Sequence, residues 1–152
     1  MGVEIERKFI VNGKNWKSEE TISISQGYLS TDIDRIVRVR MSGNDAYLTI
    51  KGRSIGAVRA EYEYQIPTSD GKELIKMCVG NILEKTRHIV MVGNSRWEVD
   101  VFHGENEGLV VAEIELKTED ESFEKPKWIG EEVTHDARYF NSSLMQKPFR
   151  QW

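Results

Sequence analysis

The chain of 152 residues has a formal net charge of -4, with 39% hydrophobic and 30% charged residues. This composition is typical of a globular protein, and the length predicts a single domain over residues 1–152. The acidic balance disfavours a nucleic-acid partner, because binding to a phosphate backbone needs a net basic surface. The sequence has no membrane-length apolar run and no signal-peptide pattern, so we expect a cytoplasmic protein without a membrane partner.

Short segments with alternating polar and apolar residues run through most of the chain, a pattern typical of β-strands. They predict eight strands, over residues 2–10, 22–30, 34–42, 45–52, 58–66, 82–92, 95–103 and 109–117. Gly-Asn turns within residues 42–45 and 92–95 predict tight hairpins, so the strands that they join should be antiparallel neighbours.

Two helices are expected beside the strands. Between the fifth and sixth strands, Asp70 and Glu73 form a capping-box pattern, and Gly80 is placed to end the helix. A second helix fits residues 135–146.

Charge is concentrated on one face of most of the predicted strands. Because successive strand residues point to opposite faces, charged residues two positions apart share a face. Three Glu-x-Glu pairs and two basic pairs have this spacing: Glu4/Glu6, Glu61/Glu63, Glu113/Glu115, Arg38/Arg40 and Lys85/Arg87. Like charges so placed repel one another unless cations lie between the carboxylates and an anion between the basic groups, which favours a metal and polyanion site. A half-exposed sheet with its polar face in water explains the same pattern about equally well.

If the eight strands close into a barrel, their charged faces can line its interior. Such a barrel is just wide enough to be filled by side chains or to hold one small ligand. Burying an isolated charge is costly, so the charged groups must be paired, hydrated or matched to a ligand. We therefore expect a wet, charged tunnel in a fold of class α+β, mainly β: an eight-stranded antiparallel β-barrel with a few flanking helices.

The charged residues also occur in a recognisable order. The opening Glu4-Ile5-Glu6-Arg7-Lys8 reads ExExK and is followed by Arg38-x-Arg40, Lys51, Glu61-x-Glu63, Lys85-x-Arg87, Asp100 and Glu113-x-Glu115. This series resembles that of the CYTH superfamily, also called triphosphate tunnel metalloenzymes. Residues 126–134, followed by Arg138, Tyr139 and Asn141, look like the tail of its short bacterial branch of inorganic triphosphatases. The resemblance covers nearly the whole chain.

The resemblance implies an eight-stranded antiparallel tunnel that hydrolyses inorganic triphosphate (tripolyphosphate) to pyrophosphate and phosphate with Mg²⁺ or Mn²⁺. The residue chemistry agrees, since Arg and Lys bind phosphate and carboxylates suit hard divalent cations. We assign the phosphates to Lys8, Arg38, Arg40, Lys51, Lys85 and Arg87. We assign the metal, or positioning of water, to Glu4, Glu6, Glu61, Glu63, Asp100, Glu113 and Glu115.

Lys8, Tyr28 and Lys85 are the expected catalytic residues, with Tyr28 assisting Lys8 near the reacting phosphate. Arg59 and Glu98 share the parity of the charged face, but pairing with neighbouring charges explains them as well. His88, His103 and His135 lack metal-ligand spacing and are expected to lie outside the site.

Other functions remain open alternatives. A thiamine triphosphatase or a class IV adenylyl cyclase on the same scaffold would need room for an organic group. A non-catalytic polyphosphate-binding module would use the same basic residues, although the many carboxylates would weaken its binding of a polyanion. A lipocalin-like binder of apolar ligands is excluded by a charged bore. The sequence leaves the oligomeric state open, with a homodimer as one alternative.

Overall fold

The computed structural model describes residues 2–152 of the chain. Its principal strands are β1 (Val3–Val11), β2 (Glu20–Ser30), β3 (Ile36–Ser42), β4 (Asp45–Lys51), β5 (Val58–Ile66), β6 (Val79–Val92), β7 (Ser95–Phe102), β8 (Val110–Glu115) and β9 (Ile129–Glu132). Its helices are α1 (Thr68–Lys76) and α2 (Asn141–Leu144), with short 3-10 turns η1 (Gly104–Asn106), η2 (Ala137–Tyr139) and η3 (Phe149–Gln151).

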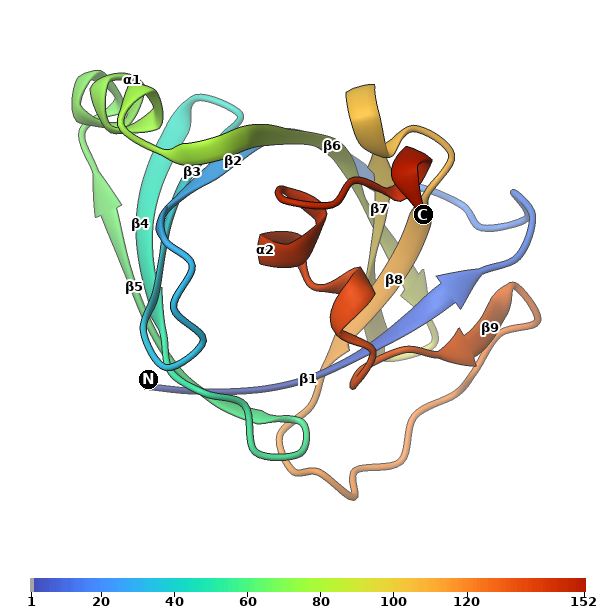
Figure 1. Ribbon diagram of the computed structural model, residues 1–152. Helices are drawn as coiled ribbons and strands as arrows, with labels where there is room; N and C mark the ends of the chain where they lie inside the picture. The colour runs from blue at the N-terminus through green and yellow to red at the C-terminus, as the bar shows by residue number, and fades with distance from the viewer. Residues whose placement is uncertain (1) are drawn as a thin grey trace.

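Eight of these strands close into a barrel (Figure 1). The strand order is β5-β4-β3-β2-β6-β7-β8-β1, and a further pairing between β1 and β5 completes the ring. Every pairing in the ring is antiparallel. β1 makes the closure possible because Val3–Ile5 pair with β5 while Glu6–Ile10 pair with β8. The predicted eight-stranded antiparallel barrel with a few helices is therefore confirmed.

The ninth strand, β9, was not predicted from the sequence. It has only four residues and pairs with the end of β1, through Phe9 and Val11. Gly130 allows this close approach, because a Cβ atom there would lie 2.8 Å from Asn12 Nδ2. So short a segment with a glycine carries little of the alternation that marks a strand. Most strand bounds also shift by one to three residues, and the largest shift is in β6, which begins at Val79 instead of residue 82.

The first helix lies near its predicted place, but the predicted capping box is wrong. α1 begins at Thr68 after Pro67, so Asp70 lies within the first turn, and no side chain among residues 2–152 caps that turn. Gly80 does not end the helix. It lies in β6 with a φ of 69°, close to the point where the pairing of β2 with β6 changes register. Gly71 is buried where α1 contacts the barrel. Only a glycine fits this contact, because a Cβ atom there would lie 2.6 Å from Ala46 Cβ.

The second predicted helix, over residues 135–146, is replaced by the 3-10 turn η2 and the short helix α2. Asp136 caps η2 by accepting a hydrogen bond from Arg138 N, and Phe140 is extended, with φ -66° and ψ 133°. This extended residue separates η2 from α2, so one continuous helix does not form. Figure 1 shows α2 lying across the opening of the barrel. Leu144 and Met145 hold it there by packing into a cluster with Leu83 of β6 and Phe102 of β7.

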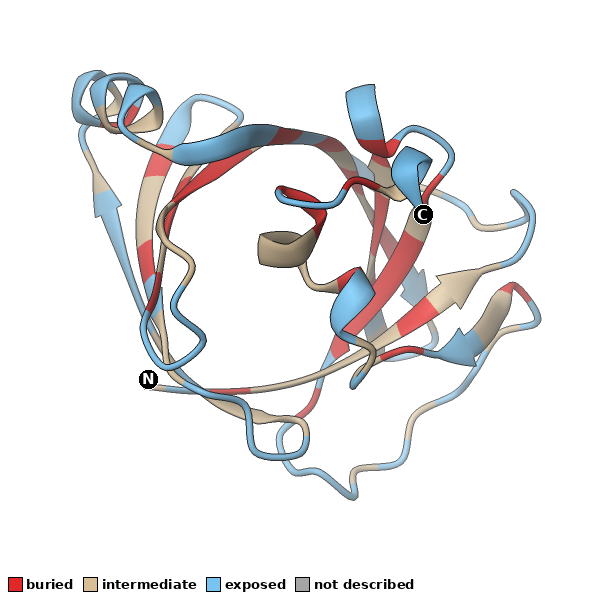
Figure 2. Cartoon of the chain, viewed as in Figure 1, coloured by how far each residue is buried: buried red, intermediate tan, exposed pale blue. Residues whose placement is uncertain are grey.

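A second apolar cluster lies where β9 and the preceding loop cover β1, β7 and β8. Trp97 is fully buried at its centre, with its ring centroid 5.6 Å from that of Phe9 and 5.9 Å from that of Trp128. Buried segments follow β7 and β8 in Figure 2. Both clusters pack against the strands of the barrel, and this packing holds the charged faces of the strands in fixed positions. None of the helices in residues 2–152 is long and apolar enough to cross a bilayer.

Candidate active site

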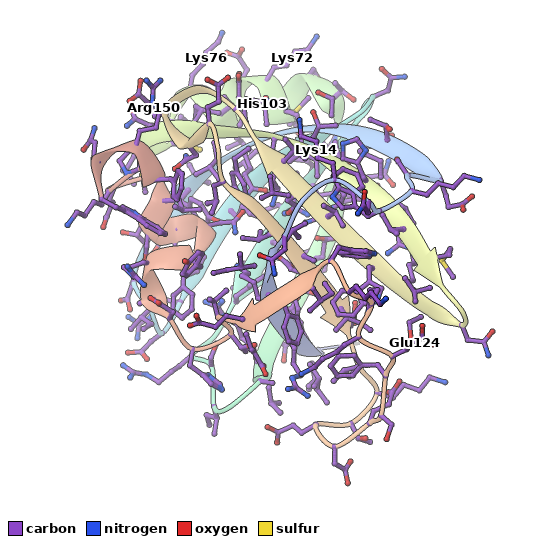
Figure 3. The ribbon with its side chains drawn as sticks, turned by 90° about the vertical axis from the view of Figure 1, so that its right-hand side faces the viewer. Lys14, Lys72, Lys76, His103, Glu124 and Arg150 are labelled. Carbon is purple, nitrogen blue, oxygen red and sulfur yellow. The ribbon has the colours of Figure 1, made fainter. Side chains whose placement is uncertain are left out.

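The barrel encloses a cavity of about 220 Å³ whose lining is mostly charged. All the expected site residues except Asp100 line it: Glu4, Glu6, Lys8, Tyr28, Arg38, Arg40, Lys51, Glu61, Glu63, Lys85, Arg87, Glu113 and Glu115. Charged residues elsewhere, such as Lys72 and Lys76 of α1 and Glu124, are exposed and point away from the barrel (Figure 3). The structure therefore decides between the two sequence-based explanations of the charged face in favour of an internal site.

Strand register brings the charged residues side by side around the ring. Lys8 of β1 lies opposite Glu113 of β8, which in turn lies opposite Glu98 of β7. On the other side of the barrel, Lys51 of β4 lies opposite Glu61 of β5. Residues directly opposite on an antiparallel pair share a face and interact. The tunnel lining thus follows from strand parity combined with the register of each pairing.

Asp100 lies behind two of the basic residues and is fully buried. Arg87 donates to both of its carboxylate oxygens, with Nε 2.8 Å from Oδ1 and Nη2 2.9 Å from Oδ2. Lys85 Nζ lies 2.8 Å from Oδ2. Burial acts to raise the pKa of Asp100, but the positive charges of Arg87 and Lys85 hold that pKa well below its usual range. These contacts orient Lys85 and Arg87, and the metal role expected for Asp100 stays a prediction.

A second network joins Lys51 to two carboxylates. Lys51 Nζ donates to Glu4 Oε1 at 3.0 Å and lies 3.3 Å from Glu61 Oε2. Burial, followed by the charge of Glu4, raises the pKa of Glu61. One ammonium group therefore contacts two carboxylates, and Arg59, which lies opposite Glu4 across β1 and β5, adds a second positive charge beside them.

Arg38 and Arg40 form the basic side of the lining. Arg38 Nη2 donates to Thr49 Oγ1 at 3.2 Å, while its buried Nε has no hydrogen-bond partner within residues 2–152. Burial, and then the charges of Arg38 and Arg87, lower the pKa of Arg40 to about 9, so its guanidinium remains protonated at neutral pH. Burial also lowers the pKa of Lys85 to about 7, against the effect of Asp100. Clustered positive charges with spare donors fit a polyanion.

Glu6, Glu98 and Glu113 form a candidate cation site. One carboxylate oxygen from each lies within 4.8 Å of the other two. Burial, then the charges of Glu113 and Glu4, raise the pKa of Glu6 well above its usual range. In the described part of the chain, no Lys or Arg forms an ion pair with Glu6. Glu98 pairs with Arg87 and Arg96, and Glu113 with Lys8, so Glu6 is the member of the cluster without such a partner. This all-oxygen donor set fits a hard divalent cation such as Mg²⁺ or Mn²⁺.

Lys8 and Tyr28 both reach the cavity but do not bond to one another among the described residues. Lys8 Nζ donates to the backbone carbonyl of Tyr139 at 3.0 Å and lies 3.7 Å from Glu113 Oε1. The Tyr28 hydroxyl accepts a hydrogen bond from Gln26 Nε2 at 3.3 Å. The expected cooperation of Tyr28 with Lys8 stays a prediction.

Several residues that line the cavity, and Gln26 behind them, were not assigned to the site from the sequence. Arg59 and Glu98 line the cavity, as their strand parity allowed. Gln26, on the same face of β2 as Tyr28, donates to and accepts from site residues. Phe140, Asn141 and Ser142 also line the cavity, because α2 lies across its opening. The sequence resemblance singled out Asn141 without giving it a role, and only the tertiary structure places Asn141 and its two neighbours at the cavity.

A second cavity, of about 330 Å³, adjoins the first. The two cavities share four lining residues: Ile36, Arg59, Phe140 and Ser142. The other residues around the second cavity are mainly apolar, hydroxyl-bearing or basic, and none of its lining residues within the described range is a carboxylate. The tunnel is therefore lined by both acidic and basic side chains, whereas the lining of the second cavity has no acidic side chain among the described residues.

Fold and site together define a tunnel protein, in which a closed antiparallel barrel presents carboxylates and basic groups to one internal cavity. The CYTH domain family model matches residues 2–149, and the chain belongs to this family.

Named relatives agree with this membership. An inorganic triphosphatase of Acetivibrio thermocellus is 49% identical over 152 residues, covering 99% of this chain and 97% of that protein. An inorganic triphosphatase of Nitrosomonas europaea is 38% identical over 145 residues, covering 93% of this chain and 95% of that protein. A solved crystal structure of an inorganic triphosphatase matches with a TM-score of 0.69 at 35% identity and covers 95% of each chain.

Proposed function

We propose that this chain hydrolyses inorganic triphosphate to pyrophosphate and phosphate inside its tunnel, with a divalent cation. The observation that carries the proposal is that seven basic side chains, the six assigned to phosphate and Arg59, line the same internal cavity as a cluster of three carboxylates. The relatives named inorganic triphosphatase support the choice of substrate.

The basic side chains bind the substrate. Three of the six assigned to phosphate are arginines, whose planar guanidinium groups can donate two hydrogen bonds at once to phosphate oxygens: Arg38, Arg40 and Arg87. The other three are lysines, whose ammonium groups act as point charges: Lys8, Lys51 and Lys85. The buried Nε of Arg38 has a hydrogen to donate and gains a partner when an anion enters. Asp100 supports this binding from behind, because it holds Arg87 and Lys85 in place without lining the cavity.

Glu6, Glu98 and Glu113 would hold the cation, which supplies charge neutralisation at phosphate oxygens and a water of lowered pKa. Mg²⁺ or Mn²⁺ fits this oxygen donor set. Glu4, Glu61, Glu63 and Glu115 surround the same cavity and remain proposed ligands or water-positioning groups.

The reaction is transfer of a phosphoryl group to water. The water oxygen bonds to a terminal phosphorus atom, the bridging P–O bond breaks, and pyrophosphate leaves with the bonding electron pair. Glu115 is suited to accept the proton of the water, because burial and then the charge of Glu4 raise its pKa. Lys8 and Lys85 stabilise charge on the transferred group. The Tyr28 hydroxyl accepts from Gln26, so its own hydrogen is free to donate to a phosphate oxygen.

Phosphate release from a substrate panel tests the proposal. The panel contains tripolyphosphate, pyrophosphate, long-chain polyphosphate, ATP and thiamine triphosphate, each measured with Mg²⁺, with Mn²⁺ and with excess EDTA. We expect tripolyphosphate with metal to give the highest kcat/KM. Tight binding of tripolyphosphate without turnover under any condition would instead identify a polyphosphate-binding module.

The second cavity supports one further candidate, hydrolysis of organic triphosphates. It adjoins the tunnel, so a triphosphate in the tunnel could extend an organic group into it. Its lining lacks carboxylates within the described residues, which disfavours the cationic thiamine group and favours a neutral nucleoside. The same panel decides this point, because a nucleoside triphosphatase would turn over ATP at least as efficiently as tripolyphosphate.

A further inference from the structure

Two neutral amide side chains connect the basic groups of the tunnel. Lys85 Nζ donates to Asn141 Oδ1 at 2.9 Å, and Gln26 Nε2 donates to the same oxygen at 3.0 Å. Gln26 Oε1 accepts from Arg40 Nε at 2.8 Å. Arg40 of β3 is thus linked through Gln26 of β2 and Asn141 of α2 to Lys85 of β6.

The orientation of both amides follows from their partners. Arg and Lys side chains only donate hydrogen bonds, so the amide oxygens must face Arg40 and Lys85. Gln26 then presents its NH₂ group to Asn141, whose oxygen accepts two hydrogen bonds. Asn141 lines the cavity, and its NH₂ group donates no hydrogen bond within residues 2–152. One neutral donor group is therefore left for a ligand.

Neutral acceptors can position cations without repelling the substrate. In its protonated form Lys85 has three hydrogens, of which Asp100 and Asn141 take two, so the third is free for a phosphate oxygen. Asn141 orients the ammonium group without adding a negative charge beside the substrate. The same C-terminal segment also holds Lys8, through the backbone carbonyl of Tyr139. Residues 139–141 thus contact two of the basic groups directly and a third through Gln26.

We propose that Asn141 is a positioning residue that aligns Lys85 and, through Gln26, Arg40 for the triphosphate. This inference rests on the proposed function for the identity of the ligand. It adds that the C-terminal segment is part of the binding site, and that the barrel without it would bind triphosphate poorly.

Binding of tripolyphosphate without metal is the first test, measured by calorimetry in EDTA on the full chain. Asn141→Leu keeps the side-chain volume and removes the hydrogen bonds, so affinity should fall at least about tenfold. Gln26→Leu should cause a similar loss through Arg40. Because both residues act through one hydrogen-bonded chain, the double variant should lose little more than the worse single variant. Losses that multiply in the double variant would overturn the linkage.

Asn106→Ala is the matched control for a merely structural effect. Asn106 Oδ1 accepts from Phe149 N at 2.8 Å, so this substitution loosens the same C-terminal segment at a point away from the tunnel. We expect it to lower Tm while changing triphosphate affinity by less than about twofold. If Asn106→Ala weakened binding as much as Asn141→Leu does, the contribution of Asn141 would be general packing and the proposal would be wrong.

The kinetic constants of Asn141→Asp distinguish a positioning role of Asn141 from a purely structural one. The carboxylate still accepts from Lys85 and Gln26, so kcat should stay within a few-fold of the parent. KM should rise at least about tenfold, because a negative charge replaces a neutral donor beside the phosphates. A fall in kcat without a change in KM would contradict the proposal. Parent protein that binds triphosphate without hydrolysing it would remove the proposed function, yet the binding tests of Asn141 would still decide this inference.

Discussion

Arg87 of β6 and Asp100 of β7 form a bidentate ion pair, with Nε–Oδ1 and Nη2–Oδ2 distances of 2.8 and 2.9 Å. Asp100 is fully buried, and Lys85 shares its Oδ2 atom. Arg87 Nη1 also lies 3.4 Å from Glu98 Oε1. The contacts with Asp100 therefore fix the direction of two basic side chains that line the cavity.

Removing the charge of Asp100 should destabilise the fold. Asp100→Asn removes the buried carboxylate that Arg87 and Lys85 share, so the free energy of unfolding should fall by about 3–5 kcal/mol. Urea unfolding in EDTA and in Mg²⁺ measures this, and a positioning role predicts the same loss in both. A loss seen only with Mg²⁺ would support the metal role instead. Glu73→Ala, which breaks an exposed ion pair with Lys76 on α1, should change stability by less than about 1 kcal/mol.

Hydrolysis should require a divalent cation. Glu6 has no basic partner among the described residues, and a cation in its cluster with Glu98 and Glu113 would separate these carboxylates from the negative charge of the substrate. We expect Mg²⁺ or Mn²⁺ to support turnover, and Ca²⁺ to support less because its longer, more flexible coordination positions oxygens poorly for transfer. Phosphate release with each metal measures this. Undiminished turnover in excess EDTA would refute the metal requirement.

Arg40→Ala and Glu6→Gln should fail in different ways. Arg40 is proposed to bind phosphate, so its loss should weaken triphosphate binding and slow turnover. Glu6→Gln removes a repelling charge and a proposed metal ligand, so metal-free binding should persist or tighten while kcat falls by at least about a hundredfold. Calorimetry and phosphate release separate the two effects. Near-normal turnover of Glu6→Gln, or parent-like binding by Arg40→Ala, would contradict this division of roles.

Glu132 should contribute to stability in a pH-dependent way. Hydrogen bonds from Arg7, opposed by partial burial, lower its pKa from 4.5 to about 2. A lowered carboxyl pKa stabilises the fold above the unfolded value, and that stability is lost as pH falls from about 4.5 to about 2. Because Glu132 is partly exposed, the effect should be modest. Glu132→Gln should flatten this part of the stability profile, measured by urea unfolding from pH 2 to 7. An unchanged acid slope would show that the pair with Arg7 contributes nothing.

The sequence by itself determined which residues share the tunnel face. Side chains alternate along a strand, so parity alone placed Glu4 with Glu6 and Lys85 with Arg87 on one side. Gly-Asn turns likewise determined the β3–β4 and β6–β7 hairpins, since the turn geometry matches the strand twist. These are local properties, and they predicted the barrel strands and all but a few of the residues at the cavity.

Only the tertiary structure decided the depth and the partners of each side chain. Asp100 and Glu98 have the same parity, yet Asp100 lies buried behind Arg87 and Glu98 lines the cavity beside Glu6. Their difference depends on the partners that each meets, Arg87 and Lys85 for Asp100 but Glu6 and Glu113 for Glu98, and no local pattern encodes those partners. Asn141 enters the site because Leu144 and Met145 pack α2 against distant strands, and such long-range packing is decided by the assembled core.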